Sequence, residues 1–108
     1  MTERRDPRVL ADAVQEAVLG TPGVAFLRPG IAELLRTVTP LTTRSSAVRV
    51  TRDKAAARWH AEIHVVLRGG HRAVDVTREV RAAVTGTLMR MTGESKPPRV
   101  SVTVTGRV

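Results

Sequence analysis

Three residues with metal-binding side chains stand at alternate positions of one apolar segment. His60, Glu62 and His64 are separated by single residues, so in an extended strand all three side chains lie on the same face. Imidazole nitrogens and carboxylate oxygens are common zinc ligands. Alternate side chains on a strand are roughly 7 Å apart, however, which is too far for all three to reach one ion. We therefore interpret the triplet as a polar sheet face, and we expect no metal site and no cofactor.

A second segment, Arg68-Gly69-Gly70-His71-Arg72, invites comparison with a phosphate-binding loop because its glycines precede an expected helix. No Gly-Lys-Ser or Gly-Lys-Thr ending follows, and several residues separate the glycines from the expected helix. We interpret the segment as a tight turn that needs positive backbone angles. The serines and threonines have no glycine elbow and no base that can be placed beside them. The chain is therefore expected not to be an enzyme.

The elements that position these residues are a strand and a helix joined by the glycines. Residues 59–67 alternate apolar and polar side chains, which predicts a strand with one buried face formed by Trp59 and every second residue after it. From Val76 to Met91 apolar residues recur at spacings of three and four, which predicts one stripe of a helix. Asp75 is the expected N-cap, and Gly93 is the expected left-handed residue that ends the helix.

The other segments are expected to complete this strand–helix unit. An apolar stripe predicts a first helix from Pro7 or Arg8 to Leu19, which Gly20 ends. After it we expect an edge strand at 24–27, a short helix at 31–38, a loop at 39–46, a strand beginning at Val48 and Val50, a turn at 52–54 and a last strand at 100–105.

The order of these segments predicts the topology. Two strands joined by a tight turn form an antiparallel hairpin, and a strand–helix–strand connection places its two strands parallel with a right-handed crossover. We therefore expect an α+β fold, in which a small mixed sheet of three to four strands has two main helices packed on one face. Residues 1–7 are expected to be a mobile N-terminal tail, and residues 8–108 a single domain.

Composition limits the classes of protein to consider. With 108 residues, 42% hydrophobic and only 2% aromatic, the chain can form one domain whose core is built from Val, Ala, Leu and Ile. The absence of cysteine excludes disulfides, thiolate metal sites and cysteine catalysis. No apolar run approaches the roughly 20 residues of a membrane-spanning helix, and no export signal is recognised. We expect a cytoplasmic protein.

The charge raises the question of a polyanionic partner. The formal net charge is +8, and only Lys54 and Lys96 are lysines among the 18 basic residues. Such a balance favours nucleic acid or an acidic membrane surface as partner, although the arginines are scattered through every segment. Sheets that bind RNA usually stack bases on aromatic side chains, and this chain has only Phe26 and an inward-facing Trp59. The candidate binding surface is the outer sheet face, which consists of Arg58, His60, Glu62, His64 and Arg68.

Short motifs along nearly the whole chain suggest a family. They are Pro22-Gly23-Val24-Ala25, then Gly30 to Leu35, then Gly70 with Val74-Asp75-Val76, and finally Met91-Thr92-Gly93 and Val100 to Gly106. In this order and spacing they resemble the alkaline shock protein family, the envelope stress response proteins of Gram-positive bacteria. The resemblance implies a non-enzymatic protein that self-associates and is held at the inner membrane face by a small membrane-anchored partner.

We therefore expect a scaffold or interaction protein of the envelope stress response. Exposed sheet edges offer a physical route to homo-oligomers through strand addition. The alternative is a basic nucleic-acid-binding or ribosome-associated protein. The residues expected at the self-association edges are Val24, Phe26, Val102 and Val104.

Overall fold

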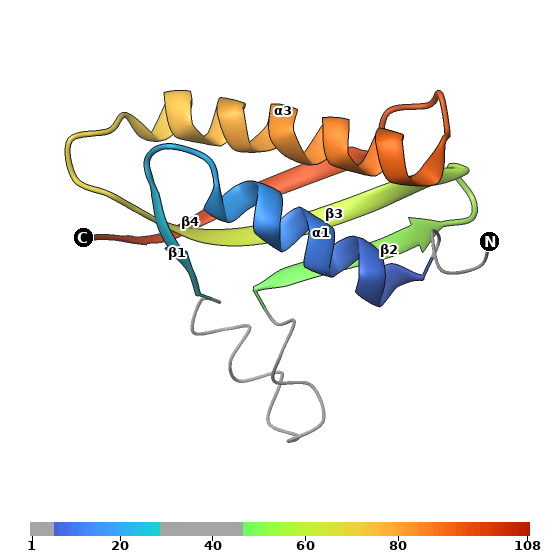
Figure 1. Cartoon of the computed structure of the whole chain (residues 1–108), viewed down its shortest axis with the longest axis horizontal. Helices are drawn as coiled ribbons and strands as arrows, with labels where there is room; N and C mark the ends of the chain where they lie inside the picture. The colour runs from blue at the N-terminus through green and yellow to red at the C-terminus, as the bar shows by residue number, and fades with distance from the viewer. Residues whose placement is uncertain (1–5, 29–46) are drawn as a thin grey trace, which may run out of the picture.

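The computed structural model describes residues 6–28 and 47–108 (Figure 1). The short helix predicted at residues 31–38 and the loop predicted at 39–46 lie outside the described residues. In chain order, the elements are α1 (Pro7–Leu19), β1 (Val24–Leu27), β2 (Val48–Asp53), β3 (Arg58–Leu67), α3 (Ala73–Thr92) and β4 (Arg99–Arg107).

Helix α1 has the bounds that its apolar stripe predicts. Asp6 is the N-cap and accepts a hydrogen bond from the backbone N–H of Arg8 at 2.9 Å, which satisfies one of the free amide groups of the first turn. Pro7 therefore belongs to the helix and not to the N-terminal tail. At the other end Gly20 is the C-cap, and its N–H donates to the carbonyl of Glu16 at 3.1 Å.

The sheet is mixed, and β3 is its central strand. β2 pairs antiparallel with β3 as the expected hairpin, in the register Val48↔Ile63, and β4 pairs parallel with the opposite edge of β3. β1 pairs antiparallel with the last residues of β3, on the same edge as β2. The predicted α+β fold with a mixed four-stranded sheet is therefore confirmed. The hairpin turn lies at residues 54–57 and not at 52–54, because Arg52 and Asp53 still pair with β3.

β1 and β2 lie end to end along one edge of β3, and His64 marks the junction. The backbone carbonyl of His64 accepts from the N–H of Arg28 at 3.3 Å, and its own N–H donates to the carbonyl of Ala47 at 2.9 Å. The chain thus leaves the sheet at Arg28 and returns to it at Ala47, beside the same residue of β3. The two strands together form one interrupted edge strand.

The core lies between one face of the sheet and the two helices. Trp59, Ala61, Ile63 and Val65 are at most 6% exposed, which confirms the buried face predicted for this strand. Both helices pack on this face, as expected, and Figure 1 shows α3 running along the sheet beside α1. The helical side chains that are fully buried against it are Leu10, Val14, Val18, Val76, Val80, Val84 and Leu88.

The start of α3 differs from the prediction. The helix begins at Ala73, and the N-cap position is Arg72 in extended backbone conformation, without a hydrogen bond from its side chain. Asp75 was the wrong choice for the cap, since it lies within the first turn. There its carboxylate still interacts favourably with the positive end of the helix dipole. The predicted end is confirmed, because Gly93 has a φ of 71° and its N–H donates to the carbonyl of Met89.

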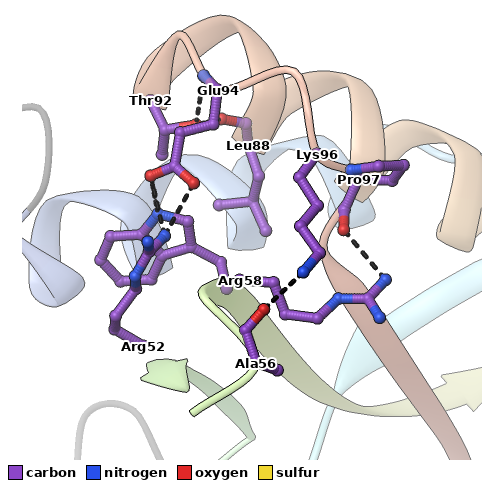
Figure 2. Close-up of polar contacts among 9 residues, drawn as sticks. Arg52, Ala56, Arg58, Leu88, Thr92, Glu94, Lys96 and Pro97 are labelled. Atoms are coloured by element: carbon purple, nitrogen blue, oxygen red, sulfur yellow. Dashed lines mark hydrogen bonds and ion pairs between the residues drawn. The ribbon is translucent and has the colours of Figure 1, made fainter. Parts of the chain in front are cut away.

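A polar cluster joins the end of α3 to the β2–β3 hairpin (Figure 2). The carboxylate of Glu94 accepts two bonds from the Arg52 guanidinium, at 2.7 and 2.8 Å, and one from the indole N–H of Trp59 at 3.1 Å. Beside it Arg58 donates to the carbonyl of Pro97 at 3.0 Å, and Lys96 donates to that of Ala56. The connector between α3 and β4 is thereby fixed to the hairpin turn.

Candidate functional site

The outer sheet face carries the polar residues predicted for it. Arg58, His60, Glu62 and His64 alternate with the core residues of β3 and are half-buried, and Arg68 follows the strand and is exposed. The register brings Ser101 opposite Glu62 and Thr103 opposite His64, so β4 extends this face.

The two histidines of this face make separate contacts. His60 Nε2 lies 3.1 Å from Ser101 Oγ, and Nδ1 of His64 is shielded from solvent and has no hydrogen-bond partner among the described residues. Within residues 6–28 and 47–108, no three His, Cys, Asp or Glu residues lie close enough together to hold a metal ion. His60 thus bonds to the neighbouring strand β4, whereas Arg58 bonds to the carbonyl of Pro97, so the polar groups of this face do not converge on a common point.

The residues expected at the sheet edges have different surroundings. Val24 is only 4% exposed and its side chain belongs to the core, and its backbone N–H already donates to the carbonyl of Thr21 at 3.2 Å. Phe26 is 39% exposed, because an irregularity in the β1–β3 pairing after Val24 places it opposite Val66 on the outer face. Val102 is half-buried against the core, and Val104 is 40% exposed. Among these four residues, Phe26 and Val104 are therefore the exposed ones.

β4 presents the longer open edge. Its nine residues pair with β3 on one side, and no strand in the described part of the chain pairs with the other side. No Pro or Lys interrupts the strand, although natural edge strands are often protected by such residues. Arg81 Nε donates to the carbonyl of Val100 at 3.4 Å and covers only the first part of the edge. From Val102 to Val104, before the bulge at Thr105, no described strand pairs with this edge.

β2 has an open edge as well, which the sequence interpretation missed. In antiparallel pairs, hydrogen-bonded and non-hydrogen-bonded positions alternate. Because His64 donates to the carbonyl of Ala47, the register directs the backbone groups of Val48, Val50 and Arg52 away from β3. No other strand in residues 6–28 and 47–108 pairs with these groups. The sequence predicted a hairpin but no register, and the bonded positions follow from a register that only the structure gives.

A groove runs along this edge of β2, between the strand and the first turns of α1. Its volume is about 230 Å³. Its walls combine apolar side chains and backbone with charged groups at the rim. The lining residues are Pro7, Arg8, Ala11, Asp12, Val48, Arg49 and Val50. An extended peptide paired with Val48 and Val50 would direct every second side chain toward this groove.

Comparison with models of protein families, with curated proteins and with solved structures found no match to this chain. None of the helices formed by the described residues is both long enough and apolar enough to cross a membrane.

Proposed function

We propose that this protein is a non-enzymatic scaffold of the cell-envelope stress response. It self-associates through β4 and docks onto a small membrane-anchored protein partner, so that it is peripheral at the inner face of the cell membrane. The observation that carries the proposal is that β2 and β4 each have β3 as their only strand neighbour among the described residues. Open edges offer backbone groups that an added strand can satisfy. With two such edges, one molecule can bind a second copy and another protein at once.

The physiological context of the proposal comes from the sequence motifs. Pro22-Gly23-Val24-Ala25, Met91-Thr92-Gly93 and the closing β4 segment resemble the alkaline shock protein family. That resemblance supports the envelope stress response and a membrane-anchored partner. The groove between α1 and β2 is the surface that suits an extended segment of such a partner.

Self-association is assigned to β4 for reasons of length and side-chain type. Two antiparallel copies of a nine-residue strand can form a continuous sheet across a twofold axis, in which each copy contributes the same surface. Valines alternate with Ser or Thr from Val100 to Thr105, and such β-branched pairs stabilise neighbouring strands. Val104, at 40% exposure, lies in the unprotected part of this edge.

The experiment is multi-angle light scattering across a range of micromolar concentrations. The wild-type protein is expected to show a mass above 11.7 kDa that rises with concentration. Val104→Lys places a charge on the edge strand and should return the mass toward the monomer value. The matched control is Val9→Lys on α1, since Val9 is 38% exposed and Val104 is 40% exposed. A wild-type protein that stays at 11.7 kDa throughout would refute the proposal.

A further inference from the structure

Basic side chains gather at one end of the molecule. They come from the end of β1 (Arg28), from the loop between β3 and α3 (Arg68, His71 and Arg72) and from the end of β4 (Arg107), and all five residues are exposed. We call this set the basic end. Figure 1 shows the C-terminus and the loop before α3 on the same side of the molecule.

Backbone and side-chain contacts hold these segments together. The N–H of Arg68 donates to the carbonyl of Gly23, just before β1, at 2.8 Å. Arg107 Nη1 donates to the carbonyl of His71 at 2.9 Å, and Thr105 Oγ1 donates to the carbonyl of Arg28 at 2.8 Å. Residues that are 77 positions apart in the chain thus lie side by side. The cluster is a consequence of the fold, and scattered arginines in the sequence give no sign of it.

The charge of the basic end is not balanced by neighbouring carboxylates. None of its four arginines forms an ion pair with a described residue. Asp75, in the first turn of α3, is the acidic residue that follows Arg72 in the sequence. At the opposite end of the molecule, by contrast, Arg52 is paired with Glu94 at 2.7 Å. Unpaired guanidinium groups attract anions, and their planar N–H groups match the oxygens of a phosphate.

We propose that the basic end binds the phosphate backbone of single-stranded RNA without sequence preference, an activity separate from the scaffold function. Single-strand sites combine positive charge with aromatic rings on which bases stack. Here the guanidinium of Arg28 lies 5.7 Å from the ring of Phe26, which is 39% exposed. Phe26 is the one exposed Phe, Tyr or Trp in the described residues. A single ring allows stacking but no reading of sequence.

RNA suits this surface better than an anionic membrane. Proteins that bind at the membrane interface usually insert Trp, Phe or Leu from one face of a basic amphipathic helix. The helix at the basic end is α3, whose apolar stripe is already buried against the sheet. Its exposed apolar residue near the basic end is Val74, a small side chain. Binding to lipid vesicles is therefore measured as well, as a test of the membrane alternative.

The first measurement is fluorescence anisotropy of a labelled mixed-sequence RNA of roughly 20 nucleotides. The logarithm of the binding constant should fall with the logarithm of salt concentration with a slope of about −3, as expected for four phosphate contacts on a single strand. A slope near zero, or no binding near physiological salt, would overturn the proposal.

The second measurement compares two variants with the same loss of charge. R28Q/R68Q/R72Q/R107Q removes the arginines of the basic end, and K54Q/R90Q/K96Q/R99Q removes exposed basic residues elsewhere. The first should weaken RNA binding about tenfold or more and the second less than about threefold. Equal losses would mean that net charge alone attracts RNA, which refutes a defined surface.

Two further arms complete the test. R68Q/R72Q keeps the Arg107–His71 hydrogen bond, so it preserves the local structure and should still weaken binding measurably. Trp59 fluorescence confirms that each variant is folded, since this tryptophan is the only one and is 6% exposed. Binding to vesicles that contain phosphatidylglycerol, without binding to RNA, would assign the surface to lipid and overturn the proposal.

Discussion

The carboxylate of Glu94 joins parts of the chain that are distant in sequence. Its bonds reach Arg52, 42 residues away, and Trp59, 35 residues away. The Arg52 guanidinium also lies 5.5 Å from the indole ring of Trp59, which adds a cation–π contact. The side chain of Glu94 is only 18% exposed, so solvent screens these bonds less than it screens an ordinary surface ion pair. One residue therefore fixes the end of α3 against the hairpin.

Glu94→Gln should lower the free energy of unfolding by about 1 to 2 kcal/mol, because hydrogen bonds to a charged group become neutral ones. Arg52 is 33% exposed, which limits the loss. Denaturant unfolding followed by Trp59 fluorescence measures the change. The control is Glu79→Gln, since Glu79 lies on the exposed side of α3, and it should change stability by less than about 0.5 kcal/mol. Equal effects of the two substitutions would contradict a specific role for Glu94.

At the scale of elements, the two described helices begin in different ways. α1 has a side-chain cap from Asp6, whereas α3 begins after Arg72 without one. The sequence favours Asp75 as the N-cap, because Asp just before an apolar helical stripe is a usual N-cap residue. Ala73, Val74 and Asp75 are nevertheless helical, so the helix begins three residues before Val76, its first fully buried residue. Periodicity reports the buried part of a helix, and the exposed Val74 and Asp75 do not continue the pattern.

Arg72→Asp should therefore stabilise the protein. A carboxylate at the N-cap can accept from the free amide groups of the first turn and interacts favourably with the helix dipole, so we expect a gain of about 1 kcal/mol. Asp6→Ala removes the corresponding bond of α1 and should lower stability by about the same amount. Thermal or denaturant unfolding of both variants measures these changes. A loss of stability in Arg72→Asp would show that the first turn of α3 cannot use a cap.

For the whole molecule, the central position of β3 determines how stability is distributed. β3 is paired with other strands along both edges, and the side chains of its inner face are buried in the core. β1, by contrast, is a four-residue strand at an edge. Opening β1 breaks few contacts, but opening β3 divides the sheet. Local opening should therefore need much less free energy at β1 than at β3.

Native-state hydrogen exchange should show this difference. Amides of Ala61, Ile63 and Val65 are expected to exchange only on global unfolding, and those of Ala25 and Phe26 through local opening. The measurement is amide exchange by NMR over a series of denaturant concentrations. Equal protection of β1 and β3 would mean that the sheet opens as one unit.

The sequence predicted most of this architecture, because the signals for it are local. The alternation of apolar and polar residues from Trp59 to Leu67 predicted the central strand. The length of the strand–helix–strand connection predicted that β4 is parallel to it. Other features depend on contacts between distant segments. Val24 lies on an edge strand as expected, but its side chain is buried in the core. The basic end and the groove beside β2 arise from segments that no sequence pattern links.

The position of His64 between β1 and β2 determines how this edge of the sheet is aligned. Arg28, at the end of β1, and Ala47, just before β2, both bond to the backbone of His64, and each strand is aligned by its own pairing with β3. A shift in the pairing of one of these strands therefore need not displace the other.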